Sequence, residues 1–425
     1  MINILRSELT FIAIAAGCTA VLKPSESAPH SAAVMQKIIE SSLDVSAYAV
    51  VQGAIPETTA LLDLKWDKIF YTGGPSVAKI ISKKAAETLT PVTLELGGRN
   101  PAIITKNADM YLAARRLLWG KNMNAGQVCV SHNYTIIEAS ALNTFVAEFK
   151  RVFDEFYPRG AKASPDYARI INKRQFNRLK GMLDNSKGNI VFGGSMDEDD
   201  LFIEPTLVVV SDIQDSLLVD ESFGPLIPIL PVADLSSAIR IANTVSGTPL
   251  GIYPFGTKAE TSRILNETRS GGASINDSFF HAAISTLAFG GVGESGQGSY
   301  RGKASFDAFT HRRSVTSTPA WFESFLFMRY PPYNNSKLAM FQMMMERTVA
   351  FDREGNEVPS LLRRIVTLGG KSDGGALSRW IVVAFGEYQP PACGQRLDLP
   401  NACGRCDVLT SSVSQWHSSC AGTPP

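Results

Sequence analysis

Cys129 is the residue whose type and surroundings first suggest covalent chemistry. It follows Asn124-Ala125-Gly126-Gln127-Val128, in which asparagine and glycine permit an unusual backbone and the close approach of a ligand. A thiol acts as a nucleophile when it lies in a polar, partly open setting beside a group that handles protons. A lone cysteine is more often inert and buried, so a structural role is the alternative.

Glu95 is the candidate for the group that handles protons. It lies in the largely apolar stretch 92–96, directly before Gly97-Gly98. Desolvation in such a stretch raises the pKa of a carboxyl group toward the range that a general base needs. The alternative is a glutamate that faces water on an edge strand.

Two glycine-rich turns could bind phosphate. Thr72-Gly73-Gly74-Pro75 joins a strand pattern to a helix pattern, and the free N–H groups and dipole of such a helix start favour a pyrophosphate. Residues 291–296 match G-x-G-x-x-G, but residues 297–302 cannot form the apolar helix that a dinucleotide-binding fingerprint requires. We therefore prefer Gly73-Gly74 as the pyrophosphate site and interpret the second turn as a shaped loop near an active site.

Metal binding and serine hydrolysis have little support in the sequence. A zinc knuckle could be built from the residues clustered near the end of the chain, which are Cys393, Cys403, Cys406, His417 and Cys420. Their spacing fits no regular zinc pattern, so we expect surface thiols and no bound metal. None of the five histidines lies in a nucleophile–base pattern with a nearby serine.

The first hundred residues alternate strand and helix patterns. Strands are expected at 20–22, 48–51, 68–72 and 91–96, and helices at 31–43, 58–64 and 75–88. Strands separated by crossover helices predict a mostly parallel sheet, and ligands of such sheets lie at the carboxyl ends of the strands.

A second α/β region follows. Strands are expected at 101–105, 134–138, 206–210 and 226–231, and helices at 108–122 and 141–156. The predicted fold class is therefore α/β. Beyond Pro319 a short helix is expected at 337–345, and the residues after Asp352 are rich in Gly, Pro, Ser and Cys, which predicts a loosely attached, partly irregular tail.

The composition excludes several classes of protein. The 425 residues are 44% hydrophobic and 19% charged, so a large core can form, and the net charge of +1 provides no field to hold nucleic acid. The apolar run from Leu9 to Leu22 is shorter than the roughly 18 residues that span a bilayer. Cys18 and Cys129 stand alone, which fits a reducing compartment and predicts a cytoplasmic protein, with attachment to a membrane surface as an alternative.

Seven segments taken together resemble the aldehyde dehydrogenase superfamily, in its order and approximate spacing, over residues 14–318. They are Lys23-Pro24-Ser25-Glu26, Thr72-Gly73-Gly74, Leu94-Glu95-Leu96-Gly97-Gly98, Gly126-Gln127-Val128-Cys129, Glu204-Pro205-Thr206, Glu221-Ser222-Phe223-Gly224-Pro225 and residues 289–296. Trp119-Gly120-Lys121 and residues 305–313 resemble the class 3 branch, which acts on fatty or aromatic aldehydes.

The resemblance implies roles for individual residues. Cys129 matches the nucleophile and Glu95 the general base. The cofactor-binding residues that it implies are Lys23 and Glu26 at the adenosine ribose, Gly73 and Gly74 at the pyrophosphate, and Glu221 and Phe223 at the nicotinamide. A carboxylate at the ribose would repel a 2′-phosphate, so NAD is favoured, although class 3 members often accept NADP as well.

The resemblance also implies an architecture and a reaction. Residues 1–97 would form a Rossmann-like coenzyme domain, 98–304 an α/β catalytic domain, 305–320 a bridging segment for a homodimer, and 321–425 a C-terminal extension. The implied reaction oxidises an apolar aldehyde, of medium or long chain or aromatic, to its carboxylic acid with NAD(P)+, through a thiohemiacetal and a thioester on cysteine. Thioester chemistry would also serve a CoA-dependent acyl reductase, but Glu95 favours hydrolysis.

One departure from the family's pattern leaves a second hypothesis open. The chain begins after the family's first strands and after the asparagine that completes its oxyanion hole, and no residue here can be assigned to that asparagine. Loss of one such donor typically costs about 10²–10³ in rate. The alternative is a catalytically impaired scaffold or a nucleotide-binding subunit.

Overall fold

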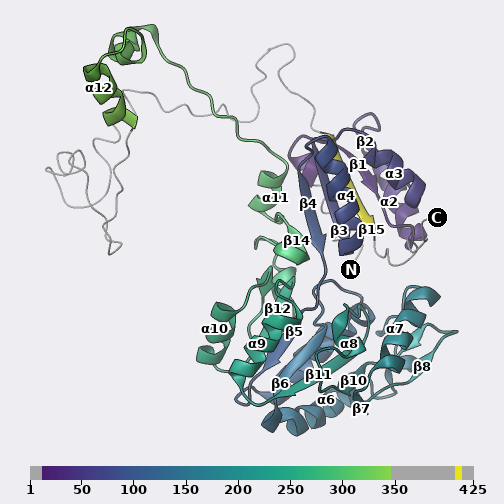
Figure 1. Cartoon of the computed structure of the whole chain (residues 1–425). Coiled ribbons are helices and arrows are strands. Elements are labelled where there is room, and N and C mark those ends of the chain that lie inside the picture. Colours follow the sequence, from purple (N-terminus) through teal and green to yellow (C-terminus); the bar gives the residue numbers. More distant parts are fainter. Residues whose placement is uncertain (1–11, 346–406, 414–425) are drawn as a thin grey trace, which may run out of the picture. The chain divides into compact units, whose positions relative to one another are not determined.

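The computed structural model describes residues 12–345 and 407–413 (Figure 1). Two units are distinguished, one formed by Met1–His311 with Gly404–Pro425 and the other by Arg312–Cys403. The first unit contains both large sheets. In the second unit, the short helix expected near residue 337 is confirmed as α12 (Asn335–Met345), which follows the 3₁₀ helix η6 (Ala320–Arg329).

The first sheet has six strands, and all neighbours are parallel except the antiparallel pair β14–β4. In sheet order they are β14 (Gly296–Gln297), β4 (Val92–Leu96), β3 (Lys68–Gly73), β15 (Asp407–Val413), β1 (Thr19–Lys23) and β2 (Tyr48–Val50). The crossover helices are α2 (Pro29–Ser42), α3 (Ile55–Leu62) and α4 (Pro75–Glu87). The alternation of strands and helices predicted for the first hundred residues is confirmed.

Helix α4 shows why these residues form a β–α–β unit. Pro75 occupies the first turn, where a missing N–H costs nothing. Val77, Ile81 and Ala85 recur at helical spacing and are buried, so one apolar stripe faces the sheet. They join Ile69 and other residues in the core of this half.

Strand β15 is a correction to the sequence-based expectation. We expected the residues after Asp352 to be loosely attached, and for residues 407–413 this is wrong, because β15 pairs in parallel with β1 on one side and β3 on the other. The segment Asp-Val-Leu-Thr-Ser-Ser-Val is short and polar for a central parallel strand, which usually reads as a continuous apolar run. Its place depends on backbone pairing with residues more than 300 positions away in the chain.

The second sheet has seven strands, all from residues 101–273, a range that includes Cys129. In sheet order they are β13 (Gly272–Ala273), β12 (Gly251–Phe255), β5 (Pro101–Ile104), β6 (Tyr134–Glu138), β11 (Leu226–Val232), β10 (Thr206–Val209) and β7 (Asn189–Phe192). Only β7 runs antiparallel to its neighbour. Strands β8 (Met196–Asp197) and β9 (Phe202–Ile203) form a separate antiparallel pair.

The remaining helices flank this sheet or connect it to the first one (Figure 1). They are α5 (Met110–Asn122), α6 (Leu142–Phe156), α7 (Lys173–Asn185), α8 (Ser216–Val219), α9 (Leu235–Val245), α10 (Lys258–Glu267) and α11 (Lys303–Ala308). Short 3₁₀ helices lie at η1 (Met123–Gly126), η2 (Ala139–Ala141), η3 (Ala161–Ala163), η4 (Phe280–Ala283) and η5 (Gly293–Ser295).

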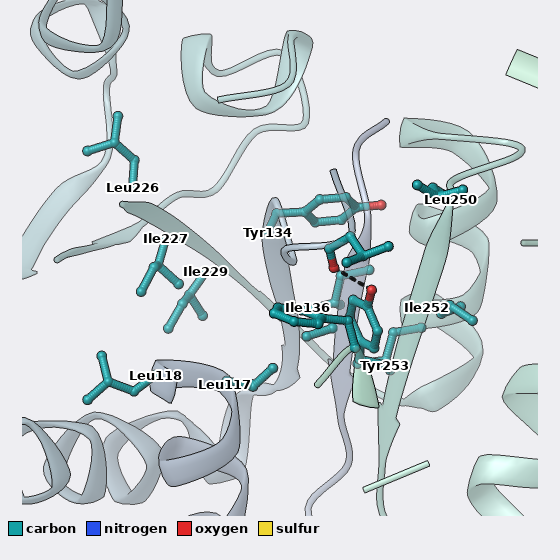
Figure 2. Packing of buried hydrophobic residues seen from close by; sticks show 14 of the residues in the cluster. Leu117, Leu118, Tyr134, Ile136, Leu226, Ile227, Ile229, Leu250, Ile252 and Tyr253 are labelled. Atoms are coloured by element: carbon teal, nitrogen blue, oxygen red, sulfur yellow. Dashed lines mark hydrogen bonds between the residues drawn. The ribbon is translucent and has the colours of Figure 1, made fainter. Parts of the chain in front are cut away.

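The largest apolar cluster is built around the second sheet (Figure 2). Every residue of β6 and β12 is buried, as expected for parallel strands covered on both faces. Figure 2 shows Leu117 and Leu118 of α5 in the same cluster as Ile136 and Tyr253. Packing in this core holds the carboxyl-terminal end of α5 and the start of β6 in place. Cys129 lies in the segment that joins them.

None of the helices in the described part of the chain is both long enough and apolar enough to cross a bilayer.

Candidate active site

Cys129 lies in a loop with the unusual backbone that the sequence predicted. Asn124 and Ala125 have φ of 52° and Gly126 has φ of 75°, so three successive residues are left-handed. A Cβ on Gly126 would lie 2.3 Å from the carbonyl oxygen of Gly224, so only glycine fits there. The conformation is held by two side-chain bonds, from Asn124 Nδ2 to Gln127 O at 3.0 Å and from Gln127 Nε2 to Asn124 O at 2.9 Å.

The Cys129 thiol is half-buried and close to two carboxylates. Desolvation raises its pKa to about 12, and the negative charges of Glu95 and Glu221 contribute to the rise. Hydrogen bonds from the N–H groups of Cys129 and Val130 act in the opposite direction. The resting group is therefore a neutral thiol that needs a base.

Glu95 lies in the middle of β4 and is only 4% exposed. It pairs with Thr72 of β3 on one side and Gly296 of β14 on the other, so the alternative of an edge-strand glutamate facing water is wrong. Within the described residues, neither carboxylate oxygen has a hydrogen-bond partner. Desolvation raises the pKa of Glu95 to about 9, and the positive charge of Arg301 partly opposes this rise.

Glu221, which comes from a later segment of the chain, also acts on the Cys129 thiol. A Cβ on Gly97 would lie 2.4 Å from Glu221 Oε2, so the contact requires glycine at the end of β4. Desolvation raises the pKa of Glu221 to about 7, against a hydrogen bond from the Gly98 N–H and the charges of Arg178 and Lys121. Glu95 and Glu221 therefore both lie close enough to the thiol to act on it electrostatically. Phe223, two residues further on, has φ of 49° and is half-buried.

The carboxyl ends of β1 and β2 border a cavity of about 180 Å³. Its lining includes Pro24, Ser25 and Glu26 after β1, and Gln52 and Gly53 after β2. Lys23 is fully buried at the end of β1, and its Nζ lies 3.4 Å from Glu26 Oε2. Both residues predicted at the adenosine ribose thus lie at the strand ends where parallel sheets bind ligands.

The predicted pyrophosphate turn joins β3 to α4. Gly74 is the N-cap of α4, no side chain caps its free N–H groups, and a Cβ there would meet no atom within 4 Å. An open, uncapped start of a 13-residue helix suits an anion. Gly73 pairs with Leu96 at the end of β4, which places the turn next to the strand that carries Glu95.

The second glycine-rich turn has the structural role expected of it. Residues 293–295 form η5, and Gly296 begins β14 beside Glu95. Cβ atoms on Gly291 and Gly296 would lie 2.0 Å and 2.1 Å from backbone oxygens. Gly296 is explained by tight packing against Leu94 of β4, and Gly291 by close approach to Ser295 within the turn.

Several residues at the site were not identified from the sequence. Arg301, which is 7% exposed, places its guanidinium 4.8 Å from the Phe289 ring and lowers the pKa of Glu95. Arg178 donates to the carbonyl oxygens of Glu221, at 3.2 Å, and Ser222. No local pattern marks these arginines, because their partners are distant in the chain.

No group of three metal-ligating side chains occurs among the residues whose positions are described. The cysteines and the histidine considered for a zinc knuckle, Cys393, Cys403, Cys406, His417 and Cys420, lie outside those residues.

The arrangement combines a thiol, a carboxylate with unused acceptor capacity, a second carboxylate and a cavity at the carboxyl ends of β1 and β2. Such a set can perform covalent catalysis followed by water attack. Comparisons with known proteins point to the same class. The model of the family described as "Aldehyde dehydrogenase family" matches residues 4–315.

Two curated relatives and one solved structure illustrate the likeness. A protein of Neurospora crassa named "Beta-apo-4'-carotenal oxygenase" is 54% identical over 382 residues, covering 88% of this chain and 71% of its own length. The mouse (Mus musculus) protein "Aldehyde dehydrogenase family 3 member A2" is 43% identical over 77% of this chain and 67% of its own. The substrate-bound structure of AldH from Staphylococcus aureus superposes with a TM-score of 0.74 at 38% identity, covering 80% of this chain and 74% of that one.

The matched region contains the second sheet, every strand of the first sheet except β15, and every site residue discussed above, and the relatives include a class 3 aldehyde dehydrogenase. The chain therefore belongs to the aldehyde dehydrogenase family.

Proposed function

We propose that this protein oxidises a long apolar aldehyde to its carboxylic acid with NAD(P)+, using Cys129 as nucleophile and Glu95 as general base. One observation supports this most directly. Glu95 and Glu221 both act electrostatically on the Cys129 thiol, and the buried Glu95 carboxylate has no bonding partner among the described residues. A base with unused acceptor capacity beside a neutral thiol suits proton abstraction.

The chain's own groups account for the proton and acyl transfers. Glu95 takes the thiol proton, and the Cys129 sulfur adds to the aldehyde carbon to form a thiohemiacetal, whose oxyanion the Val130 N–H can stabilise. When bound, a nicotinamide would accept the hydride that leaves the thiohemiacetal carbon, and this loss converts the thiohemiacetal into a thioester. The resulting thioester is hydrolysed when Glu95, having lost its proton to solvent, deprotonates a water molecule. The acid leaves and the thiol is restored.

Cofactor binding fits the residues of the first sheet. Lys23 and Glu26 would hold the adenosine ribose, and the open start of α4 at Gly73-Gly74 would lie at the pyrophosphate. Glu221 and Phe223 would contact the nicotinamide end, since Glu221 lies against Gly97 and acts on the thiol. The family uses NAD(P)+, and we propose a preference for NAD.

An apolar substrate is supported by the surface next to α5. Trp119 is 40% exposed and stacks with Phe279, with ring centroids 5.5 Å apart. Phe280, Ile284 and Leu287 are also exposed in the following segment. Exposed apolar groups that gather in this way mark ligand or partner surfaces. The name of the Neurospora relative suggests a polyene aldehyde as a further candidate.

The purified 425-residue chain is expected to form NADH and acid in equal amounts from a long-chain aldehyde. Because apolar contact area grows with the chain, kcat/KM should rise from short to long aldehydes. The measurement is NADH absorbance combined with quantification of the acid. Absence of NADH with every aldehyde, from a folded protein that binds NADH, would contradict the proposal and favour the impaired scaffold.

A homodimer remains our prediction for the oligomeric state and is checked by light scattering.

Glu26→Gln is expected to shift cofactor use toward NADP. The Glu26 carboxylate lines the proposed ribose site and would lie close to a 2′-phosphate, so removing its charge should raise the NADP-to-NAD ratio of kcat/KM about tenfold. Glu40→Gln is the matched control, because Glu40 is an exposed glutamate of α2 that accepts a hydrogen bond from Gln36 at 2.7 Å. An equal change in both variants would argue against a specific role for Glu26.

A further inference from the structure

Asn100 makes an unusual pair of bonds to the nucleophile loop. Its side-chain Nδ2 donates to the carbonyl oxygens of Cys129, at 2.8 Å, and Ser131, at 2.9 Å. Its Oδ1 accepts from the Gly251 N–H at 2.9 Å. All three partners fix which side-chain atom is nitrogen, because carbonyls need donors and an amide N–H needs an acceptor. Asn100 is completely buried, so these bonds face no competition from water.

Two further buried side chains bind the remaining carbonyls of the loop. The Tyr253 hydroxyl donates to the Val130 carbonyl, and Figure 2 shows Tyr253 inside the apolar cluster with this bond dashed. Lys121 Nζ donates to the carbonyl of His132 at 2.8 Å. Four successive carbonyls, from residues 129 to 132, therefore each accept a bond from a side chain of another element.

The burial of these donors indicates a specific role. Tyr253 is 0% and Lys121 only 1% exposed. Burying an ammonium group is costly, and the pKa of Lys121 is accordingly lowered to about 7 by desolvation, with the charge of Glu221 opposing this shift. An apolar side chain at this position would avoid that cost. The lysine is therefore best explained by the bond that it gives to the loop.

The geometry of the peptide group connects these bonds to the reacting sulfur. In a trans peptide the C=O and the following N–H point in opposite directions. Asn100 holds the Cys129 carbonyl, so the Val130 N–H of the same peptide group is turned the other way. That N–H lowers the pKa of the Cys129 thiol, as expected of a donor that lies close to the sulfur. Fixing the carbonyl thus aims a donor at the place where negative charge develops.

We propose that Asn100, Tyr253 and Lys121 form a carbonyl clamp, a set of positioning residues that hold the 129–132 backbone so that the Val130 N–H faces the sulfur and the nascent oxyanion. This proposal rests on the proposed function, in which Cys129 is the nucleophile. The clamp residues act through the loop.

Tyr253→Phe is the most conservative test, because it removes one oxygen atom and one clamp bond. We expect kcat to fall about tenfold, the KM for NAD to stay within twofold, and the rate of Cys129 alkylation by iodoacetamide at a fixed pH to fall. Asn100→Ala removes two clamp bonds and should lower kcat about 10²-fold, as expected for a misplaced nucleophile. Lys121→Met keeps the length of the side chain without its donor and should resemble Tyr253→Phe.

Tyr167→Phe is the matched control, since Tyr167 is 4% exposed and its hydroxyl donates to the Ile203 carbonyl at 2.8 Å, outside the nucleophile loop. It should lower the melting temperature comparably and leave kcat and the alkylation rate of Cys129 unchanged. Wild-type kcat and alkylation in folded Tyr253→Phe and Lys121→Met would overturn the clamp, even if Asn100→Ala fails to fold. Alkylation followed by peptide mapping needs no turnover. An inactive wild type with shifted alkylation in the variants would therefore reject the proposed function and retain the clamp.

Discussion

Cys129→Ala is expected to lower NADH formation from an aldehyde at least about 10⁴-fold, because alanine can form neither the thiohemiacetal nor the thioester. The proposed adenosine and pyrophosphate parts of the cofactor site lie at the first sheet and should be intact, so NADH should still bind with an affinity close to that of the wild type. Initial rates and a fluorescence titration with NADH measure the two properties separately.

Cys18→Ala is the control for that variant. Cys18 is 2% exposed, and its Sγ lies 3.5 Å from the Phe309 carbonyl oxygen, in a structural setting. The substitution should cost some stability and leave the rate close to that of the wild type. If Cys129→Ala and the wild type oxidise the aldehyde equally fast, Cys129 is not the nucleophile.

Glu95→Gln is expected to slow steady-state turnover by about 10²–10⁴, because an amide cannot accept a proton from water. Hydrolysis of the thioester should suffer most. If some acylation persists, mixing enzyme, aldehyde and NAD should give a burst of NADH of at most one equivalent per site, followed by a very slow phase. Rapid-mixing absorbance and mass spectrometry of an acylated Cys129 provide the measurements. A steady rate equal to that of the wild type would exclude Glu95 as the base.

The pH dependence of the hydrolysis rate should distinguish the wild type from Glu95→Gln. The pKa of Glu95 is raised to about 9, so the wild-type hydrolysis rate should rise with pH up to about that value, and this rise should be absent in Glu95→Gln. The folded state holds the proton more tightly than the unfolded state. Wild-type stability is therefore lost progressively as pH rises from the ordinary carboxyl pKa toward about 9, by up to about 1.4 kcal/mol per pH unit.

Denaturation midpoints at pH 5 and pH 8 test this second consequence. Glu95→Gln should be stabilised relative to the wild type by more at pH 8 than at pH 5, since the neutral amide avoids the cost of a buried negative charge. An identical stability difference at both pH values would show that the Glu95 carboxylate is better solvated than its burial indicates.

The local elements were predictable because their signals are local. The apolar residues of α4 recur at helical spacing, and β6 is rich in aromatic and β-branched residues, which favour strands. Asparagine at 124 and glycine at 126 likewise predicted the unusual backbone before Cys129, which is left-handed in the structure. Strand β15 was missed because a short polar segment has no such signal, and its partners β1 and β3 lie at the opposite end of the sequence.

By itself, the sequence determined which residues could do chemistry and, through seven spaced segments, which family they resemble. Tertiary structure alone decided what surrounds them. It placed strands on both sides of Glu95, brought Glu221 against Gly97, and joined Asn100 and Tyr253 to a loop 29 and 123 positions away in the chain. The reason is that burial and hydrogen bonding depend on contacts between distant segments, and these form only when the two sheets have packed.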